Sequence, residues 1–254
     1  MTSIFKPYPA KQNIEKGQTM YADVINHCLA YKEYIDPSSK ITSAHEVTHR
    51  CNSDIRNEAG GNVNGFYVGN DRAIVIPEPN TKKSDCAQYI PESLRGGRYS
   101  LYITGQQEWN NQPLYIFDEF VAYTNDVWAA IMLKRLENYV EQGVIIDGPV
   151  EFISYATATM MAADRAGSLN QPLIDFGRWM LRHAYNSYFE SLKDFPPYDV
   201  QDKIYNIHKS GNEWQMHRTF LKQRLNYEVP SGIEPENDDP NPPTPPDTPI
   251  NWYI

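Results

Sequence analysis

The spacing of apolar and polar residues predicts a mainly helical chain with one short extended region. Apolar side chains recur every three or four positions in several long stretches, which is the pattern of helices with one buried face. The predicted helices cover residues 20–34, 39–59, 120–140, 150–165, 172–193 and 201–227. Gly211 and Asn212 favour a break in the last of these stretches.

Two segments between these helices have extended character. Residues 65–68 and 72–76 are rich in β-branched and aromatic residues, and a Gly-Asn-Asp turn joins them, so we expect a β-hairpin that ends at Pro77. Residues 98–104 alternate in the manner of a half-buried strand. The chain is therefore expected to have an α+β fold, mainly helical, with a small and mostly antiparallel sheet.

The predicted helix at residues 39–59 has two distinct faces. Ser39 or Thr42 supplies a side-chain cap at its start, and Gly60 provides the expected stop. At about 100° per residue, one narrow stripe is apolar and a separate one is polar. The apolar stripe consists of Ala44, Val47, Cys51 and Ile55, and the polar stripe consists of His45, His49, Asn52 and Arg56. We interpret Cys51 as core filling and not as a metal ligand.

The polar stripe contains the pattern His-Glu-x-x-His at residues 45–49. A spacing of four places His45 and His49 one helical turn apart on the same face, so both imidazoles can reach one metal ion. Glu46 projects from a neighbouring direction, where it can act as a base on a water molecule without being a ligand. The alternative is that two surface histidines flank a glutamate on a solvated face. The histidine-rich composition of the stripe favours the metal site.

A catalytic zinc ion usually has three protein ligands, so a further ligand is needed. Residues 50–56 lack the glycine and third histidine of the metzincin pattern, which leaves a carboxylate from a later helix. Residues 118–126 fit this role, because Glu119 shares a helical face with small alanines that allow close approach of the first helix. The other donors that we considered are Glu58, Glu108, His183, His208 and His217. Of these, Glu108 lies in a polar loop and His183 on an aromatic-rich helix; the remaining histidines are read as packing or surface residues.

With these two segments the chain resembles the gluzincin-type zinc metallopeptidases. They combine His-Glu-x-x-His with a glutamate on a second helix, often followed by an alanine and an acidic or aromatic residue, as in residues 119–123 here. The resemblance implies that His45, His49 and Glu119 bind Zn²⁺ and that Glu46 is the general base. It also implies that Asp118 orients one histidine. Tyr123 stands where thermolysin-like members carry an aspartate, and Asp126, one turn further, is the nearest substitute.

The same resemblance implies the chemistry and the overall architecture. Zinc lowers the pKa of its water from 15.7 toward about 7, and a nearby hydroxyl or imidazole stabilises the oxyanion that develops on the substrate. The donors to be tested are, in order, Tyr115, Tyr123, Tyr102 and His183. A zincin-like fold also places the sheet beside the active-site cleft, where an edge strand can bind substrate backbone.

Composition excludes some other functions. The chain has 254 residues and a net charge of -9, which argues against nonspecific nucleic-acid binding and mildly favours neutral or cationic peptides. It contains no apolar run of about 18 residues, so we expect no membrane span. Residues 1–18 lack an apolar secretory core, and the three cysteines favour a reducing compartment, although one disulfide stays open. The sequence does not determine the compartment, and a cytoplasmic location and export after processing both stay open.

The last part of the chain differs in composition from the rest. From residue 229 onward the sequence is acidic and rich in proline, so we expect an extended segment at 229–254 after a catalytic domain at 1–228. Its apolar end, residues 250–254, is a candidate for docking on this molecule or on a partner.

The sequence therefore predicts a zinc-dependent peptidase that acts on a peptide or protein substrate. Two alternatives stay open: a zinc hydrolase acting on a non-peptide or cell-wall amide, and a noncatalytic binding protein on a zincin scaffold. The second alternative does not explain why Glu46 accompanies both histidines.

Overall fold

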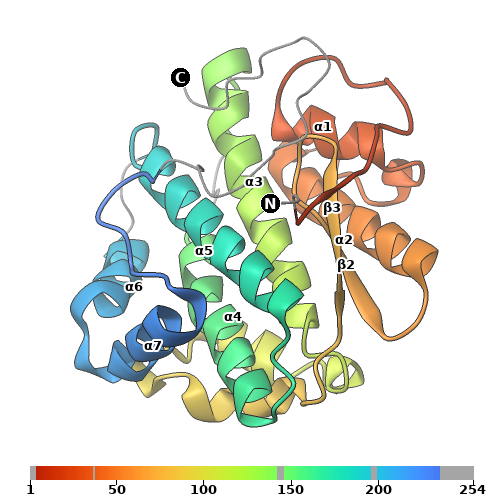
Figure 1. Ribbon diagram of the computed structural model, residues 1–254. Helices are drawn as coiled ribbons and strands as arrows, with labels where there is room; N and C mark the ends of the chain where they lie inside the picture. The colour runs from red at the N-terminus through yellow and green to blue at the C-terminus, as the bar shows by residue number, and fades with distance from the viewer. Residues whose placement is uncertain (1–3, 37, 142–145, 196–198, 235–254) are drawn as a thin grey trace.

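The computed structural model describes residues 4–36, 38–141, 146–195 and 199–234, and shows a mainly helical molecule with a small antiparallel sheet (Figure 1). This confirms the coarse α+β prediction. The helices are α1 (Met20–His27), α2 (Lys40–Ala59), α3 (Tyr115–Glu137), α4 (Gly148–Arg165), α5 (Gln171–Ser191), α6 (Asp199–Ser210) and α7 (Gln215–Phe220). The strands are β1 (Lys6–Pro7), β2 (Val63–Tyr67) and β3 (Arg72–Pro77).

Helix α3 is the centre of the molecule, with α4 and α5 beside it and α1, α2 and the sheet across from them (Figure 1). It is buried on almost every side, and its buried residues include acidic and polar side chains as well as apolar ones. Its first half, with Phe117 and Phe120, joins the core formed with α4 and α5. Its second half, with Val127 and Ile131, joins the core formed with α1 and α2. Side chains on α3 can therefore meet α2 in a desolvated setting.

The predicted hairpin at residues 65–76 is confirmed. β2 and β3 pair antiparallel with Phe66 opposite Ile74, and β1 adds to the other edge of β3, so the strand order is β1-β3-β2. Asn70 and Asp71 in the turn both have positive φ, 55° and 54°, a conformation that asparagine and aspartate tolerate better than most residues. The strong turn residues of the sequence thus set the register of the hairpin.

The predicted strand at residues 98–104 is wrong. These residues form a π-helical turn, Tyr99–Thr104, in which the neighbours Tyr102 and Ile103 are both buried. A strand would send two adjacent side chains to opposite faces, whereas a helical turn can bury both. The fully buried Lys83 stabilises the turn, because its ammonium group donates to the carbonyls of Tyr102 (2.5 Å) and Gly105 (2.7 Å). This tertiary contact overrides the local alternation.

The first helix is shorter than predicted. α1 ends at His27, Cys28 has extended backbone angles, and only a 3₁₀ turn, Tyr31–Glu33, follows. The amide of Gln12 donates to the carbonyls of Ile25 and Cys28, which satisfies acceptors that a continuing helix would have used. The break predicted in the last helical stretch is confirmed, because α6 ends at Ser210 and α7 starts at Gln215.

The described beginning of the proline-rich segment contains no helix or strand and lies against α5 and α6. The backbone of Glu234 exchanges two hydrogen bonds with the Asn186 side chain, both 2.9 Å, and Tyr205 donates to the Pro230 carbonyl. Residues 235–254, which include the predicted apolar docking tip, lie outside the described residues. Within the described part of the chain, every helix is too short or too polar to cross a membrane.

Candidate metal centre

Helix α2 presents its histidines on the face turned toward α3. Ser39 is the cap, since its hydroxyl accepts from the Thr42 amide at 2.9 Å, and Gly60, with φ of 65°, ends the helix. The apolar stripe, including Cys51, is buried against α1, as predicted. His45 and His49 are half-buried and Glu46 is exposed. The two faces of the helix therefore have the separate roles that their composition indicates.

Three predicted side chains converge at the crossing of α2 and α3. The Nε2 atoms of His45 and His49 lie 3.1 Å apart, and Glu119 Oε2 lies 3.7 Å from the first and 3.5 Å from the second. The ligand atoms of the three residues all lie within 4.8 Å of one another, and no other such group of histidine, cysteine and acidic side chains occurs among the described residues. These separations are compatible with three donors around one ion.

A carboxylate holds each imidazole from its other nitrogen. His45 Nδ1 lies 3.1 Å from Asp126, and His49 Nδ1 lies 3.1 Å from Asp118. Asp118 also accepts a 2.5 Å hydrogen bond from the fully buried Asn52, whose own oxygen accepts from the Tyr67 amide at 2.7 Å. Such carboxylate contacts favour a proton on Nδ1 and leave the Nε2 lone pair free.

These donors fit a divalent cation. With protons on both Nδ1 atoms, two Nε2 lone pairs face each other and the negatively charged Glu119, which is electrostatically unfavourable without a positive charge between them. Glu119 Oε2 is buried and has no hydrogen-bond partner, a costly state for a carboxylate oxygen. A cation at the point between the three atoms would satisfy all of them at once.

The pKa values of the cluster reflect burial and the negative charge of its carboxylates. Burial lowers the pKa of His49, but Asp118 and Glu119 outweigh it and raise that pKa well above its usual value. Burial raises the pKa of Glu119, yet His49, Tyr115 and His45 together hold it below its usual value. For Asp126, burial dominates and raises the pKa to about 6 despite the bond to His45. The two acidic side chains therefore favour positive charge at this position.

The hydroxyl of Tyr115, the first predicted oxyanion donor, is hydrogen-bonded to Glu119. Its hydroxyl donates to Glu119 Oε1 at 2.5 Å, and its ring stacks on Trp109 at a centroid distance of 5.0 Å. This hydroxyl orients the carboxylate, so that Oε2 faces the two histidines.

Tyr123, the second predicted oxyanion donor, lies beside His45. Its ring meets the His45 ring edge-on at 4.5 Å, and its hydroxyl is 3.1 Å from that of Tyr102. A Cβ atom added at Gly148 would lie 2.3 Å from the Tyr123 ring, so the start of α4 packs tightly on it. The guanidinium of Arg98 lies over the same ring at 4.9 Å. Tyr123 and Tyr102 thus form a pair of hydroxyls next to one ligand.

The alternative ligands lie elsewhere. Glu108 is exposed and outside the cluster, and Glu58 pairs with Lys11 at 3.1 Å. His183 stacks on Trp179 at 4.6 Å, and His208 contacts Ser154 at 2.6 Å, while His217 stacks on a buried tryptophan. The three histidines are packing residues, in agreement with their reading from sequence, and His183 does not belong to the metal cluster.

The sequence patterns gave no role at the site to Asn52 or Arg98, two residues that shape it. Asn52 belongs to the polar stripe, and its position three residues after His49 is a signal that it faces the same partner helix. Tyr102, one of the predicted oxyanion donors, reaches the site through a π-helical turn and not through the predicted strand. Arg98 precedes that turn and pairs with Asp147 (2.9 Å) and Glu151 (2.8 Å), contacts that no local pattern indicated.

The expectation that an edge strand binds substrate backbone is not supported at β2. The outer edge of Tyr67 is already occupied, because its amide donates to Asn52 and its carbonyl accepts from Asn125 at 3.2 Å. The segment at 98–104, the other edge strand considered, is helical.

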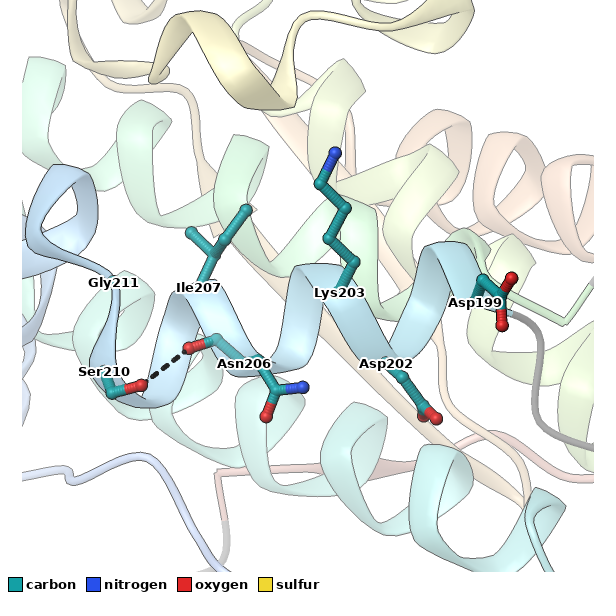
Figure 2. A pocket seen from close by; sticks show the side chains of 7 residues that line it. All are labelled: Asp199, Asp202, Lys203, Asn206, Ile207, Ser210 and Gly211. Atoms are coloured by element: carbon teal, nitrogen blue, oxygen red, sulfur yellow. Dashed lines mark hydrogen bonds between the residues drawn. The ribbon is translucent and has the colours of Figure 1, made fainter.

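A surface pocket exists on another part of the molecule. Figure 2 shows that its lining side chains come from one stretch around α6, with Lys203 and Ile207 pointing to one side and Asp202 and Asn206 to the other. Helix α6 packs on α4, and α2 packs on α1, α3 and the sheet, so this pocket is separate from the metal cluster (Figure 1). It contributes no residue to the candidate centre.

No protein-family model, curated protein or solved structure matches this chain. The chemistry is therefore inferred from the geometry of these side chains.

Proposed function

We propose that this protein is a zinc-dependent metallopeptidase of the gluzincin type, with a zincin-like catalytic fold. The convergence of His45, His49 and Glu119, each oriented by a further side chain, is the observation that carries the proposal. The exposed Glu46 beside them supplies the general base.

The donor set favours zinc over other common ions. Two imidazole nitrogens and one carboxylate oxygen match the ligands of catalytic zinc sites, whereas magnesium and calcium prefer oxygen donors alone. A structural zinc site usually closes with four protein ligands, and only three are present among the described residues. When bound, the ion would supply Lewis-acid chemistry, acidifying water and polarising the scissile carbonyl.

Glu46 would move the proton. It lies one residue after His45 on α2 and about 60° around the helix from His49. Its side chain is exposed. Its carboxylate would take a proton from the attacking water, as the water oxygen bonds to the carbonyl carbon. It would then deliver this proton to the leaving nitrogen as the C–N bond breaks.

Among the predicted oxyanion donors, Tyr123 is the one that we assign to this role. The Tyr115 hydroxyl donates to Glu119, while the Tyr123 ring lies against His45 and its hydroxyl lies 3.1 Å from that of Tyr102. A hydroxyl here would donate to the oxygen of the scissile carbonyl as negative charge develops on it. Tyr115 would instead hold Glu119.

The test is cleavage of a diverse peptide library by zinc-loaded protein, with products identified by mass spectrometry. Glu46→Gln should retain a full equivalent of zinc and lose at least 100-fold in kcat, because a carboxamide cannot accept the proton of water. His45→Ala should lose zinc, as measured by elemental analysis after dialysis. Equal cleavage by wild type and Glu46→Gln, or no cleavage by zinc-loaded wild type, would contradict the proposal.

A further inference from the structure

We propose that Arg56 and Trp109 form a subsite that binds a carboxylate of the substrate peptide, two to four residues from the bond that is cut. This inference rests on the proposed function, since it uses the metal centre as the position of the scissile bond. It adds a substrate class, peptides with a carboxylate at a defined distance, to the proposed activity.

Helix geometry places Arg56 on the histidine face of α2. It follows His45 by eleven residues, about 20° around the axis, and therefore projects between the directions of His45 and His49. It lies seven residues beyond His49, about 10 Å along the helix. An extended peptide advances about 3.3–3.6 Å per residue, and the long arginine side chain adds reach, so two to four residues span this separation.

Aromatic rings connect Arg56 to the metal ligands. Its guanidinium lies 5.9 Å from the centroid of Trp109, Trp109 stacks on Tyr115, and Tyr115 donates to Glu119. Trp109 is half-buried, as is Arg56. An aromatic face beside a planar guanidinium holds that cation in one orientation and leaves its edge available for a carboxylate.

Arg56 differs from the other basic residues of α2 in its ion pairs. Lys40 pairs with Glu137 at 2.7 Å, and Arg50 pairs with Asp54 at 3.0 Å. Arg56 donates only a 3.3 Å bond to Ser53, and no carboxylate oxygen of the described residues lies within 4.0 Å of its guanidinium.

An acidic side chain that interacts electrostatically with Arg56 has other hydrogen-bond donors. Glu78 is close enough for Arg56 to affect its charge, but its two oxygens accept from the Leu114 amide at 3.0 Å and from Asn64 at 3.5 Å. Arginine binds carboxylates through paired N–H donors, and the guanidinium of Arg56 has donors left for that contact. A partly buried cation that lies over a tryptophan ring, and forms no ion pair with the residues that the structure describes, is suited to an anionic group of a ligand.

The experiment measures binding and cleavage of matched peptides by the full chain. Fluorescein-labelled peptides carry glutamate or glutamine at each position from two to four residues on either side of the cleaved bond, and a second pair ends in a free carboxylate or an amide. Binding to zinc-loaded Glu46→Gln protein is read by fluorescence anisotropy, and cleavage by wild type as kcat/KM. The variant Arg56→Gln removes the guanidinium, and Arg50→Gln is the matched control on another face of the same helix.

We expect the glutamate peptide, at one or two positions, to bind about five- to tenfold more tightly than its glutamine partner. Arg56→Gln should abolish this ratio, and Arg50→Gln should leave it unchanged; because each ratio compares two peptides on one protein, a loss of folded fraction cancels. If only the free C-terminal carboxylate is preferred, the anion is the peptide end and not a side chain. The subsite would be overturned if protein with Arg56 and the Arg56→Gln variant gave the same ratio of affinities for the two peptides. It would also be overturned if no peptide with a carboxylate were preferred. Carboxylate-dependent binding without cleavage by wild type would instead overturn the peptidase.

Discussion

At the scale of single residues, the tautomers of two imidazole rings, those of His45 and His49, decide what the candidate centre can bind. Asp126 and Asp118 each lie 3.1 Å from an Nδ1 atom, which directs both Nε2 lone pairs to the same point as the Glu119 oxygen. The sequence indicated Asp118 by its place before the ligand glutamate. The sequence did not settle whether Asp126 is the partner of His45, because only the crossing of two helices shows which carboxylate reaches that ring.

Asp118→Asn is predicted to weaken zinc binding about 10- to 100-fold. The neutral amide keeps the shape of the side chain but no longer stabilises the Nδ1–H form of His49, so the ring is a poorer ligand. Competition with a chromophoric chelator measures the dissociation constant. Asp54→Asn, which alters an ion pair with Arg50 on the same helix, serves as the control. Unchanged affinity in a variant with a normal circular dichroism spectrum would contradict the role of Asp118.

At the scale of elements, the close approach of β2 to α2 holds α2, the helix that carries His45 and His49, in place. A Cβ atom built on Gly65 would lie 2.6 Å from Ile55 Cγ2 and 2.7 Å from the Arg56 amide nitrogen, so only glycine fits. Asn52, on the same helix, accepts a hydrogen bond from the Tyr67 amide. The strand and the helix thereby position Asn52, which in turn holds Asp118.

Gly65→Ala is therefore predicted to lower the free energy of unfolding by about 1–3 kcal/mol. The added methyl group must displace the backbone of α2 or β2, because the nearest atoms include a main-chain nitrogen. Urea denaturation followed by circular dichroism measures the change. Gly97→Ala is the matched control, since nothing lies within 4 Å of a Cβ built there. Equal stability of the two variants would show that the strand–helix contact yields without cost.

At the scale of the whole molecule, Glu78 joins the sheet to the central helix. It follows β3 directly, and its carboxyl accepts from the Leu114 amide just before α3. Burial raises the pKa of Glu78 to about 7, although the bonds from Leu114 and Asn64 and the charge of Arg56 oppose the shift. The connection between the two parts of the fold therefore depends on pH.

The sign of this dependence follows from linkage. The pKa of Glu78 in the folded state exceeds its unfolded value, so the folded state binds the proton more strongly. The resulting stability is fully present below the unfolded pKa of 4.5 and is lost as the pH rises through about 7.

Glu78→Gln, which stays neutral, should match the wild type in stability near pH 4.5 and exceed it by about 1–3 kcal/mol at pH 8.5. Urea denaturation across this pH range measures the difference. Glu92→Gln, at an exposed site, should show no such trend. A wild type that is as stable as Glu78→Gln at pH 8.5 would contradict the raised pKa.

Much of the centre was predictable from sequence because its signals are local. A spacing of four residues is enough to place His45 and His49 on one face of a helix, and an isolated run of Gly, Asn and Asp is enough to turn a hairpin. The helix with Glu119 was also predictable, since its apolar residues recur over many turns. The prediction of a strand at 98–104 was wrong because a buried residue distant in sequence, Lys83, donates hydrogen bonds to the carbonyls of Tyr102 and Gly105. These bonds stabilise a helical turn.

The sequence alone determined which side chains are candidates for a metal site and on which helical faces they lie, since helical periodicity follows from backbone geometry. Only the tertiary structure decided that Glu119 meets both imidazoles and that Tyr115 binds this carboxylate. It also decided that Arg56 pairs with no carboxylate in the described part of the chain. These facts depend on how α2 and α3 cross and on which loops cover them. Such contacts join residues far apart in the chain, and their energies do not leave a periodic trace in the sequence.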